Sequence, residues 1–334
     1  MSKKGTLLLK RKDLASLMTL QDYIQGIELA FRMHGEGKTF GVDMIHGETP
    51  SELEFHIKVG GLQLGENRYY GLKMNASNFN NQDLFGLPNI MGVVLLYEGV
   101  KGIPLAVVDA GDPTRKRTGA ATAVAAKYLA RKNSKVVTIC GCGTQGRIQL
   151  KALKEVLPIE KVFGYDINTD LAAEYAQEMT EELDIEISVV TDLKTSLQVS
   201  DVLVTCTPSK SPYIKREYVR SGTFIAAVGA DSPDKQELDE TLLKDNKIVT
   251  DVTKQCARAG ELHHALDKKL ITLADVHGQL GEVICGKVTA RENDDEIVIY
   301  DATGTALQDV AAAALYYEKA LKTDQGQYIN FFEE

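Results

Sequence analysis

The sequence predicts an α/β protein that combines an antiparallel sheet with a doubly wound parallel sheet. Two observations carry this prediction. From about residue 117 onward, short apolar runs alternate with helical segments, which is typical of parallel strands covered by helices on both faces. Before that point, two long apolar runs are joined by a short glycine-bounded turn, which indicates antiparallel pairing. The 334 residues are long enough for two domains.

The first third of the chain is expected to hold a helix and the antiparallel sheet. Residues 14–32 carry apolar side chains at roughly helical spacing. The runs IMGVVLLYE (90–98) and IPLAVVDAG (103–111) are joined by residues 99–102, so we expect a hairpin there. The polar segment Asn75–Asp83 is predicted to be a loop, either at the plain surface or at the rim of a site.

An alanine-rich helix within residues 118–130 leads into the alternating region. The first strand, VVTIC (136–140), is followed by a helix from Gly146, and KVFGYD (161–166) is followed by a second helix. Further β-rich runs are IEISVV, DVLVTC, TFIAAVG and KIVTDV. The last helix, from residue 303, begins after the alternation ends, so we expect it to pack back on the first domain.

Composition limits the partners and the compartment. The formal net charge of −9 argues against nucleic acid as the main partner. No apolar run approaches the length of a membrane span, and the three leucines at 7–9 are too few for a signal peptide. The five cysteines are odd in number and lie mostly in apolar runs, which favours a reducing compartment. We therefore expect a cytoplasmic protein that binds neither nucleic acid nor membrane.

The stretch CGCGTQGR (140–147) admits a phosphate-binding interpretation. Gly141, Gly143 and Gly146 form a GxGxxG loop that follows an apolar strand and opens a helix. Glycines there permit a tight turn and a close approach of the backbone to a pyrophosphate, which the N–H groups at the helix start favour. Asp166, 20 residues after Gly146, can accept hydrogen bonds from a ribose, so NAD is favoured and NADP remains possible. The alternative is a glycine turn in an unrelated unit.

A metal site in the same stretch lacks ligands. Cys140 and Cys142 form a CxC pair, but the other cysteines stand singly, without CxxC or histidine spacing. His263 and His264 are adjacent and point in different directions on a helix. We therefore expect no metal site, with Cys140 as a small core residue.

Four segments together resemble the ornithine cyclodeaminase/μ-crystallin family, which includes archaeal-type alanine dehydrogenases and imine reductases. They are residues 117–131, 140–146, 228–239 and 300–314, in the family's order and at its spacing. The resemblance extends from about residue 40 to 320. It implies a Rossmann-type NAD(P)-binding domain (117–303) inserted into a discontinuous α+β substrate and dimerisation domain (1–116 plus 304–334). It also implies a homodimer formed through the substrate-domain sheets.

The resemblance assigns roles to individual residues. Asp231 falls on the catalytic carboxylate, which acts as general acid or base; alternatively, it is a helix N-cap. Lys73 falls on the active-site lysine, and Arg117 on an arginine that reaches the substrate carboxylate and the cofactor. Without the resemblance, each would be an ordinary surface cation. Glu54 falls on a substrate-side acid. The remaining matches are cofactor contacts: Asn89, Thr144, Gln145, Thr207, Val228, Gly229 and Lys235.

Two positions depart from the family pattern. By ungapped spacing from Glu54, Asp43 stands where many relatives carry a carboxylate-binding arginine, and His56 stands where an apolar residue is common. We hypothesise that Asp43 turns this side of the pocket toward an amine or another cationic or neutral group. The alternatives are a shifted register and an Asp43 that points to solvent.

The resemblance implies three candidate functions. The first is an NAD(P)-dependent oxidoreductase acting on the C–N bond of an amino acid or its imine, in either direction, with Asp231 moving the proton. Its substrate would be an amino acid, a 2-oxo acid or ester plus an amine, or a cyclic imine. The second is an ornithine or lysine cyclodeaminase that uses bound NAD in an internal redox cycle and releases ammonia; Asp43 disfavours ornithine. The third is a μ-crystallin-like ligand-binding protein, against which Lys73, Arg117 and Asp231 together argue.

Overall fold

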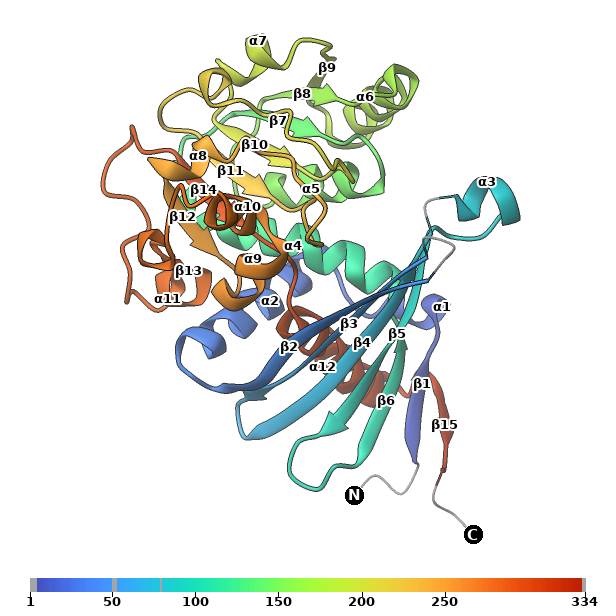
Figure 1. Cartoon of the computed structure of the whole chain (residues 1–334). Helices are drawn as coiled ribbons and strands as arrows, with labels where there is room; N and C mark the ends of the chain where they lie inside the picture. Colours follow the sequence, from blue (N-terminus) through green and yellow to red (C-terminus); the bar gives the residue numbers. More distant parts are fainter. Residues whose placement is uncertain (1–4, 50–52, 79, 332–334) are drawn as a thin grey trace. The chain divides into compact units, whose positions relative to one another are not determined.

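The computed structural model describes residues 5–49, 53–78 and 80–331. The chain divides into two compact units (Figure 1). Unit 1 combines Met1–Arg117 with Thr305–Glu334, and unit 2 is the continuous segment Thr118–Gly304. No helix in the described ranges is long and apolar enough to cross a membrane.

The described part of unit 1 contains a seven-stranded sheet with the order β15-β1-β6-β5-β4-β3-β2. Its strands are β1 (Thr6–Leu9), β2 (Thr39–Glu48), β3 (Glu54–Leu64), β4 (Asn67–Ser77), β5 (Ile90–Glu98), β6 (Pro104–Asp109) and β15 (Gln327–Ile329). Strands β2 to β6 pair antiparallel in sequence order, and the β5–β6 pairing confirms the predicted hairpin. The predicted loop Asn75–Asp83 is wrong at both ends, because β4 continues to Ser77 and helix α3 (Asn81–Phe85) begins within it.

One face of this sheet is covered by helix α12 (Ala306–Thr323), which also packs against α2 (Leu20–Gly35). The packing is close, since a Cβ atom on Gly60 of β3 would lie 3.3 Å from the Cβ atom of Ala306. A buried Tyr23–Tyr316 hydroxyl pair joins the two helices, with their rings edge to face. The last helix therefore packs on unit 1, as the sequence predicted. The short helix α1 (Arg11–Leu14) follows β1.

Residues that face one another across the antiparallel strands share one face of the sheet. One row, on the face that α12 covers, joins Met44, Lys58, Lys73 and Val94 across β2 to β5. The next residue along each strand points to the opposite face. There Ile45, Ile57, Met74 and Val93 form an apolar row, and Ile45, Met74 and Val93 in it are exposed.

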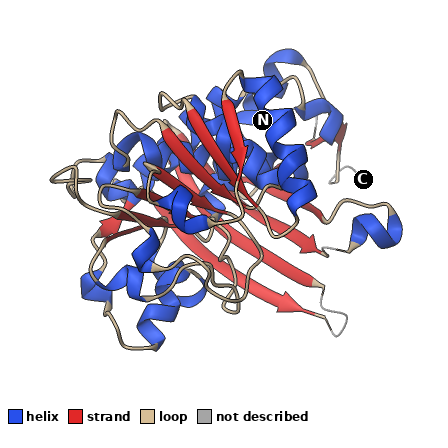
Figure 2. Cartoon of the chain, turned by 90° about the horizontal axis from the view of Figure 1, so that it is seen from above, coloured by secondary structure: helices blue, strands red, loops and turns tan. Residues whose placement is uncertain are grey.

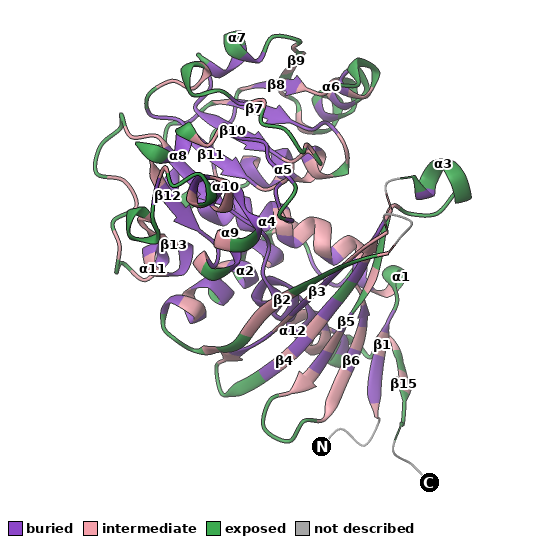
Figure 3. Ribbon diagram, viewed as in Figure 1, coloured by how far each residue is buried: buried purple, intermediate pink, exposed green. Residues whose placement is uncertain are grey.

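The described part of unit 2 holds an eight-stranded sheet with the order β13-β12-β14-β11-β10-β7-β8-β9, and all its pairings are parallel. Its strands are β7 (Val136–Cys140), β8 (Lys161–Tyr165), β9 (Glu186–Val189), β10 (Val202–Thr205), β11 (Phe224–Ala227), β12 (Lys247–Thr250), β13 (Gly278–Gln279) and β14 (Val298–Asp301). The central strands are buried along their whole length, which explains their unbroken apolar sequences (Figure 3).

Helices alternate with most of these strands in the chain. Figure 2 shows the helices in blue and the strands in red. They are α4 (Gly111–Leu129), which begins in unit 1, α5 (Thr144–Lys154), α6 (Thr169–Leu183), α7 (Leu193–Leu197), α8 (Thr241–Lys244), α9 (Thr253–Ala259), α10 (Glu261–Asp267) and α11 (Leu280–Ile284). The chain runs outward from β7 to β8 and β9, then returns to β10 on the other side of β7. Ligands of doubly wound sheets bind at such a switch point, at the carboxyl ends of the strands. The predicted doubly wound parallel sheet is confirmed.

Candidate active site

The glycine loop lies at this switch point, directly after β7. Gly141 has a φ of +101°, a conformation that L side chains rarely adopt, and an added Cβ would lie 3.0 Å from the carbonyl oxygen of Cys206. A Cβ on Gly146 would lie 2.1 Å from the oxygen of Gly141, whereas one on Gly143 would meet nothing within 4 Å. Two glycines therefore hold the turn and the third leaves the backbone open to a ligand. Helix α5 begins at Thr144, so its first N–H groups also lie at this turn.

Asp166 directly follows β8 and is fixed beside the glycine loop. Its carboxylate accepts a hydrogen bond from the Cys142 N–H at 2.8 Å and another from the Asn168 N–H at 2.9 Å. A carboxylate in this place can bind ribose hydroxyls and repels an additional phosphate. The loop and Asp166 thus fit a dinucleotide, and NAD better than NADP.

A buried glutamate that the sequence analysis missed connects two further cofactor positions. The Glu237 carboxylate accepts hydrogen bonds from the Thr207 N–H at 2.8 Å, the Gly229 N–H at 3.0 Å and the Tyr213 hydroxyl at 2.8 Å. Burial raises the pKa of Glu237, which these hydrogen bonds oppose. One side chain therefore fixes the segments that follow β10 and β11, where Thr207, Val228 and Gly229 were predicted to contact the cofactor.

Asp231 lies four residues after β11, at the same edge of the sheet. Its Oδ1 accepts a hydrogen bond at 2.8 Å from Lys235, whose ammonium is buried, while the Asp231 side chain is 34% exposed. Turns, not a helix, follow Asp231 in the described chain, so the alternative of a helix N-cap is wrong. A carboxylate that is partly exposed and held by a cation suits proton exchange with a ligand.

The unit 1 residues form a buried cluster of charges on the face that α12 covers. Asp309 of α12 accepts hydrogen bonds at 3.0 Å from the ammonium of Lys73 and at 3.0 Å from Nε of Arg117. Gln308 accepts another from Arg117. Lys58 stands opposite Lys73 in the β3–β4 register, and all four charged residues are buried. We call Lys58, Lys73, Arg117 and Asp309 the cation cluster.

The cation cluster has more positive than negative charge. Burial lowers the pKa of Lys73 to about 7, and the nearby charges of Arg117 and Lys58 contribute to this shift against the attraction of Asp309. Burial alone would raise the pKa of Asp309, but Arg117, Lys73 and Lys58 hold it below its usual range. Lys73 and Arg117 therefore offer an ammonium and a guanidinium donor at one place, which is suited to binding an anion. Sequence reasoning missed Lys58 and Asp309.

Glu54 and His56 lie on the same face as Lys58, since positions 54, 56 and 58 of one strand alternate with outward-facing ones. His56 is buried, and its Nε2 lies 3.2 Å from Oε2 of Glu54. Asp43, however, pairs with Val59 and lies on the opposite face from Lys58. The expectation that Asp43 lines this side of the pocket is therefore wrong. The pairing is regular from Glu48 opposite Glu54 to Asp43 opposite Val59, so the alternation of faces along the strands separates Asp43 from Lys58.

The other predicted cofactor residues divide between the units. Thr144 and Gln145 open α5 in unit 2, and Lys235 is bound to Asp231. Asn89 lies in unit 1, where its side chain accepts a hydrogen bond from the Gln82 N–H at 3.0 Å and so holds the start of α3.

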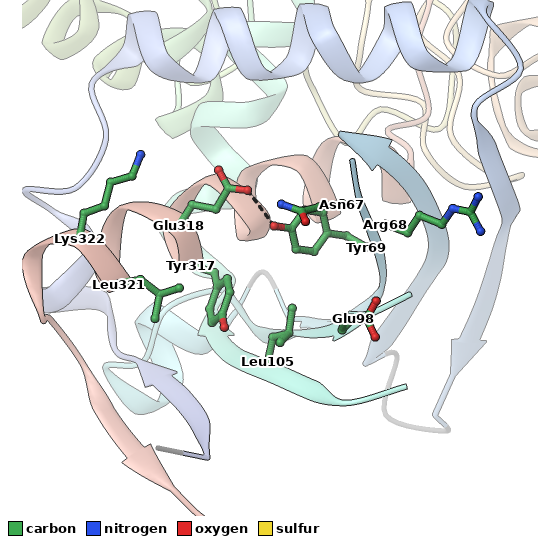
Figure 4. Close-up of a pocket in the computed structure, with 9 residues that line it drawn as sticks. All are labelled: Asn67, Arg68, Tyr69, Glu98, Leu105, Tyr317, Glu318, Leu321 and Lys322. Carbon is green, nitrogen blue, oxygen red and sulfur yellow. Dashed lines mark hydrogen bonds between the residues drawn. The ribbon is translucent and has the colours of Figure 1, made fainter. Parts of the chain in front are cut away.

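A cavity of about 610 Å³ lies in unit 1 at the start of β4 (Figure 4). It is lined by Asn67, Arg68, Tyr69, Glu98, Leu105, Tyr317, Glu318, Leu321 and Lys322. The Tyr69 hydroxyl donates a hydrogen bond at 2.7 Å to Glu318 across its wall. None of the lining residues belongs to the cation cluster or to the sequence-predicted site.

Comparison with known proteins agrees with this geometry. The chain is 42% identical to an alanine dehydrogenase of Archaeoglobus fulgidus over 98% of this chain and 99% of that protein. It superposes with a TM-score of 0.92 on the structure of an archaeal alanine dehydrogenase dimer with bound NAD, at 42% identity, covering 98% of this chain and 99% of that one.

A second solved structure is similarly close. It is the Δ1-pyrroline-2-carboxylate reductase of Thermococcus litoralis in complex with NADH and L-proline, with a TM-score of 0.91 and 34% identity over 97% of this chain and 100% of that one. The sequence profile of the ornithine cyclodeaminase/mu-crystallin family matches residues 4–324. The chain therefore belongs to the ornithine cyclodeaminase/mu-crystallin family.

Proposed function

We propose that the protein is an NAD-dependent oxidoreductase that acts on the C–N bond of an amino acid or of the corresponding imine. The observation that carries the proposal is the cation cluster, in which buried Lys73 and Arg117 share the Asp309 carboxylate and buried Lys58 stands opposite Lys73. Alanine and proline, named for two similar proteins, both carry a carboxylate on the carbon that bears nitrogen. Buried ammonium and guanidinium groups are donors that can bind such a carboxylate.

NAD, when bound, would supply the hydride acceptor or donor. Gly141, Gly143 and Gly146 would receive its pyrophosphate, and Asp166 its ribose. Unit 2 would thus be the cofactor domain, and unit 1 the substrate and dimerisation domain.

The chain's own residues would position the substrate and move protons. Lys73 and Arg117 would bind the carboxylate, with Lys58 adding positive charge. Asp231 would exchange a proton with the substrate nitrogen or with the attacking water as the imine forms or breaks. Lys235, 2.8 Å from Asp231, would keep that carboxylate oriented. Glu54 and His56 would line the substrate side of the pocket.

The test is a matrix of substrates and cofactors with the purified full chain. Pyruvate with ammonia and Δ1-pyrroline-2-carboxylate would each be offered with NADH and with NADPH. Stoichiometric loss of NADH with formation of an amino acid supports the proposal. Ammonia release from ornithine or lysine without net turnover of the cofactor would instead identify a cyclodeaminase.

Replacing Asp166 tests the cofactor assignment. Asp166→Ser is expected to raise the kcat/KM ratio of NADPH to NADH on the order of 100-fold, because like-charge repulsion costs several kcal/mol. Affinity for NADH also falls, since the Cys142 N–H and the ribose lose their acceptor. Asp170→Ser, an exposed acid in the first turn of α6, is the matched control. An unchanged ratio for Asp166→Ser would place the ribose elsewhere.

We also propose that the protein is a homodimer, like the archaeal alanine dehydrogenase dimer on which it superposes. The apolar row Ile45, Ile57, Met74 and Val93 offers a suitable surface, with Ile45 59% and Met74 40% exposed.

The cysteines in the described chain form no disulfides, which fits a cytoplasmic protein.

Met74→Glu is expected to convert the dimer into a monomer, because it buries a charge in the middle of that surface. Light scattering coupled to size-exclusion chromatography measures the mass. Val199→Glu, at an exposed apolar position of unit 2, should leave the mass unchanged. A dimeric Met74→Glu variant would show that another surface pairs the chains.

A further inference from the structure

Three metal-binding side chains meet at the β2–β3 strand pair in unit 1. His46 stands directly opposite His56 in the register, and Glu54 precedes His56 by two residues on the same strand. All three therefore lie on one face of the sheet. One ligand atom from each residue lies within 4.8 Å of those of the other two.

The spacing suits a small tetrahedral site. Two ligands bound to Zn²⁺ at 2.0–2.2 Å lie about 3.3–3.6 Å apart at the tetrahedral angle. Nε2 of His56 and Oε2 of Glu54 are already 3.2 Å apart. The ring centroids of His46 and His56 are 4.4 Å apart with the planes at 88°, so the two imidazoles approach each other edge to face. The ligand atom of His46 lies within 4.8 Å of the other two, so the site forms when this side chain moves closer to them.

His46, Glu54 and His56 differ in burial, which gives each a different role in binding an ion. His56 is 5% exposed, and the Glu54 side chain is 17% exposed, so the strand pair holds both in place. His46 is exposed. A bound ion would thus have two fixed ligands, a third that closes from the solvent side, and a fourth position open to water.

We propose that His46, Glu54 and His56 bind a divalent transition metal ion, for which Zn²⁺ is the best suited. Two imidazoles with one carboxylate are a ligand set that Zn²⁺ accepts, whereas Mg²⁺ and Ca²⁺ prefer oxygen ligands alone. The ion would tie β2, which is at the edge of the sheet, to β3. The competing account is that Glu54 and His56 form only a hydrogen-bonded pair.

The test uses the full chain, freed of metal by a chelator and dialysed, and then titrated with Zn²⁺ and with Co²⁺. We expect one ion per chain, a higher Tm with Zn²⁺ and visible d–d absorption of tetrahedral Co²⁺. His46→Ala and Glu54→Gln should each weaken Zn²⁺ binding by more than about tenfold, since even outer-shell partners contribute roughly 10–100-fold. Excess Mg²⁺ should not displace the ion. Glu54 and His56 are also proposed to line the substrate pocket, so substituting them is expected to change activity as well. The test therefore measures metal binding and Tm, which do not depend on activity.

Two matched variants serve as controls. Glu48→Gln changes the acid that stands opposite Glu54 but lies outside the ligand group, and His277→Gln removes a histidine of unit 2. Both should bind Zn²⁺ as the parent protein does. Unchanged NADH binding verifies the fold of every variant. Absence of Zn²⁺ binding would overturn the proposal, as would binding that survives His46→Ala and Glu54→Gln or is lost on alkylating the cysteines.

Discussion

An Asp231→Asn variant is expected to lose about 10²–10⁴-fold in kcat, the usual contribution of a positioned general acid or base. Asparagine has the same shape, and its carbonyl oxygen can still accept the hydrogen bond that Lys235 donates at 2.8 Å. The substitution therefore leaves the local geometry in place and removes only the capacity to exchange a proton. The measurement is kcat at saturating substrate and NADH, together with the Kd of NADH from its fluorescence, which should not change.

Asp234→Asn is the matched control for this loss. Asp234 belongs to the same turn and is bonded to Ser232 and paired with Lys210, with its side chain 49% exposed. Its substitution should alter kcat little. If Asp231→Asn retained kcat within a factor of about ten, a different group would have to carry the proton.

Asp309→Asn is expected to lower the free energy of unfolding by about 3–5 kcal/mol, because it leaves buried cations without their counter-charge. Lys73 and Arg117 both lie 3.0 Å from the same Asp309 oxygen, so one substitution removes two ion pairs. Denaturant unfolding at fixed protein concentration measures the effect, since dimerisation contributes to apparent stability. Adding Lys73→Met to Asp309→Asn should restore part of the loss.

An exposed ion pair provides the comparison. Arg216 lies 2.6 Å from Asp245, with side chains 47% and 55% exposed, and Asp245→Asn should cost at most about 1 kcal/mol. A similarly small loss of unfolding free energy for Asp309→Asn would mean that the repulsion between the buried cations is reduced by another route. The first route is entry of solvent, and the second is deprotonation of Lys73. The second route is measurable through pH. Asp309 raises the pKa of Lys73, which is about 7 in its presence, so the pKa falls below that value in the variant. Stability of the variant would then improve as pH rises from this lowered pKa toward the ordinary pKa of an unfolded lysine.

The parallel sheet and its glycine loop could be predicted because the central strands are buried along their whole length and most strands adjoin a helix in the sequence. The continuous stretch VVTICGCGTQGR (136–147) contains the strand, all three glycines of the turn and the start of the helix. Residues that are neighbours in the sequence are also neighbours in the structure there.

The cation cluster could be predicted only in part, because its members meet through long-range pairing. Lys73 and Asp309 are 236 residues apart in the sequence, and nothing near either residue marks the other. Lys58 becomes a neighbour of Lys73 only through the β3–β4 register. Asp43 is placed by its pairing with Val59, one residue beyond Lys58 and therefore on the other face, and a match by ungapped spacing does not contain that pairing.

The position of Asp309 on the last helix has a consequence for the order of folding during synthesis. Lys58, Lys73 and Arg117 emerge from the ribosome well before α12, so the face of the sheet that carries them stays uncovered until then. Unit 2 is continuous and is complete at Gly304, so it can fold while unit 1 waits for its final segment. Chains interrupted after unit 2 would expose Lys73 and Arg117 without Asp309, together with the apolar surface around them. Such chains would be natural substrates for chaperones and proteases.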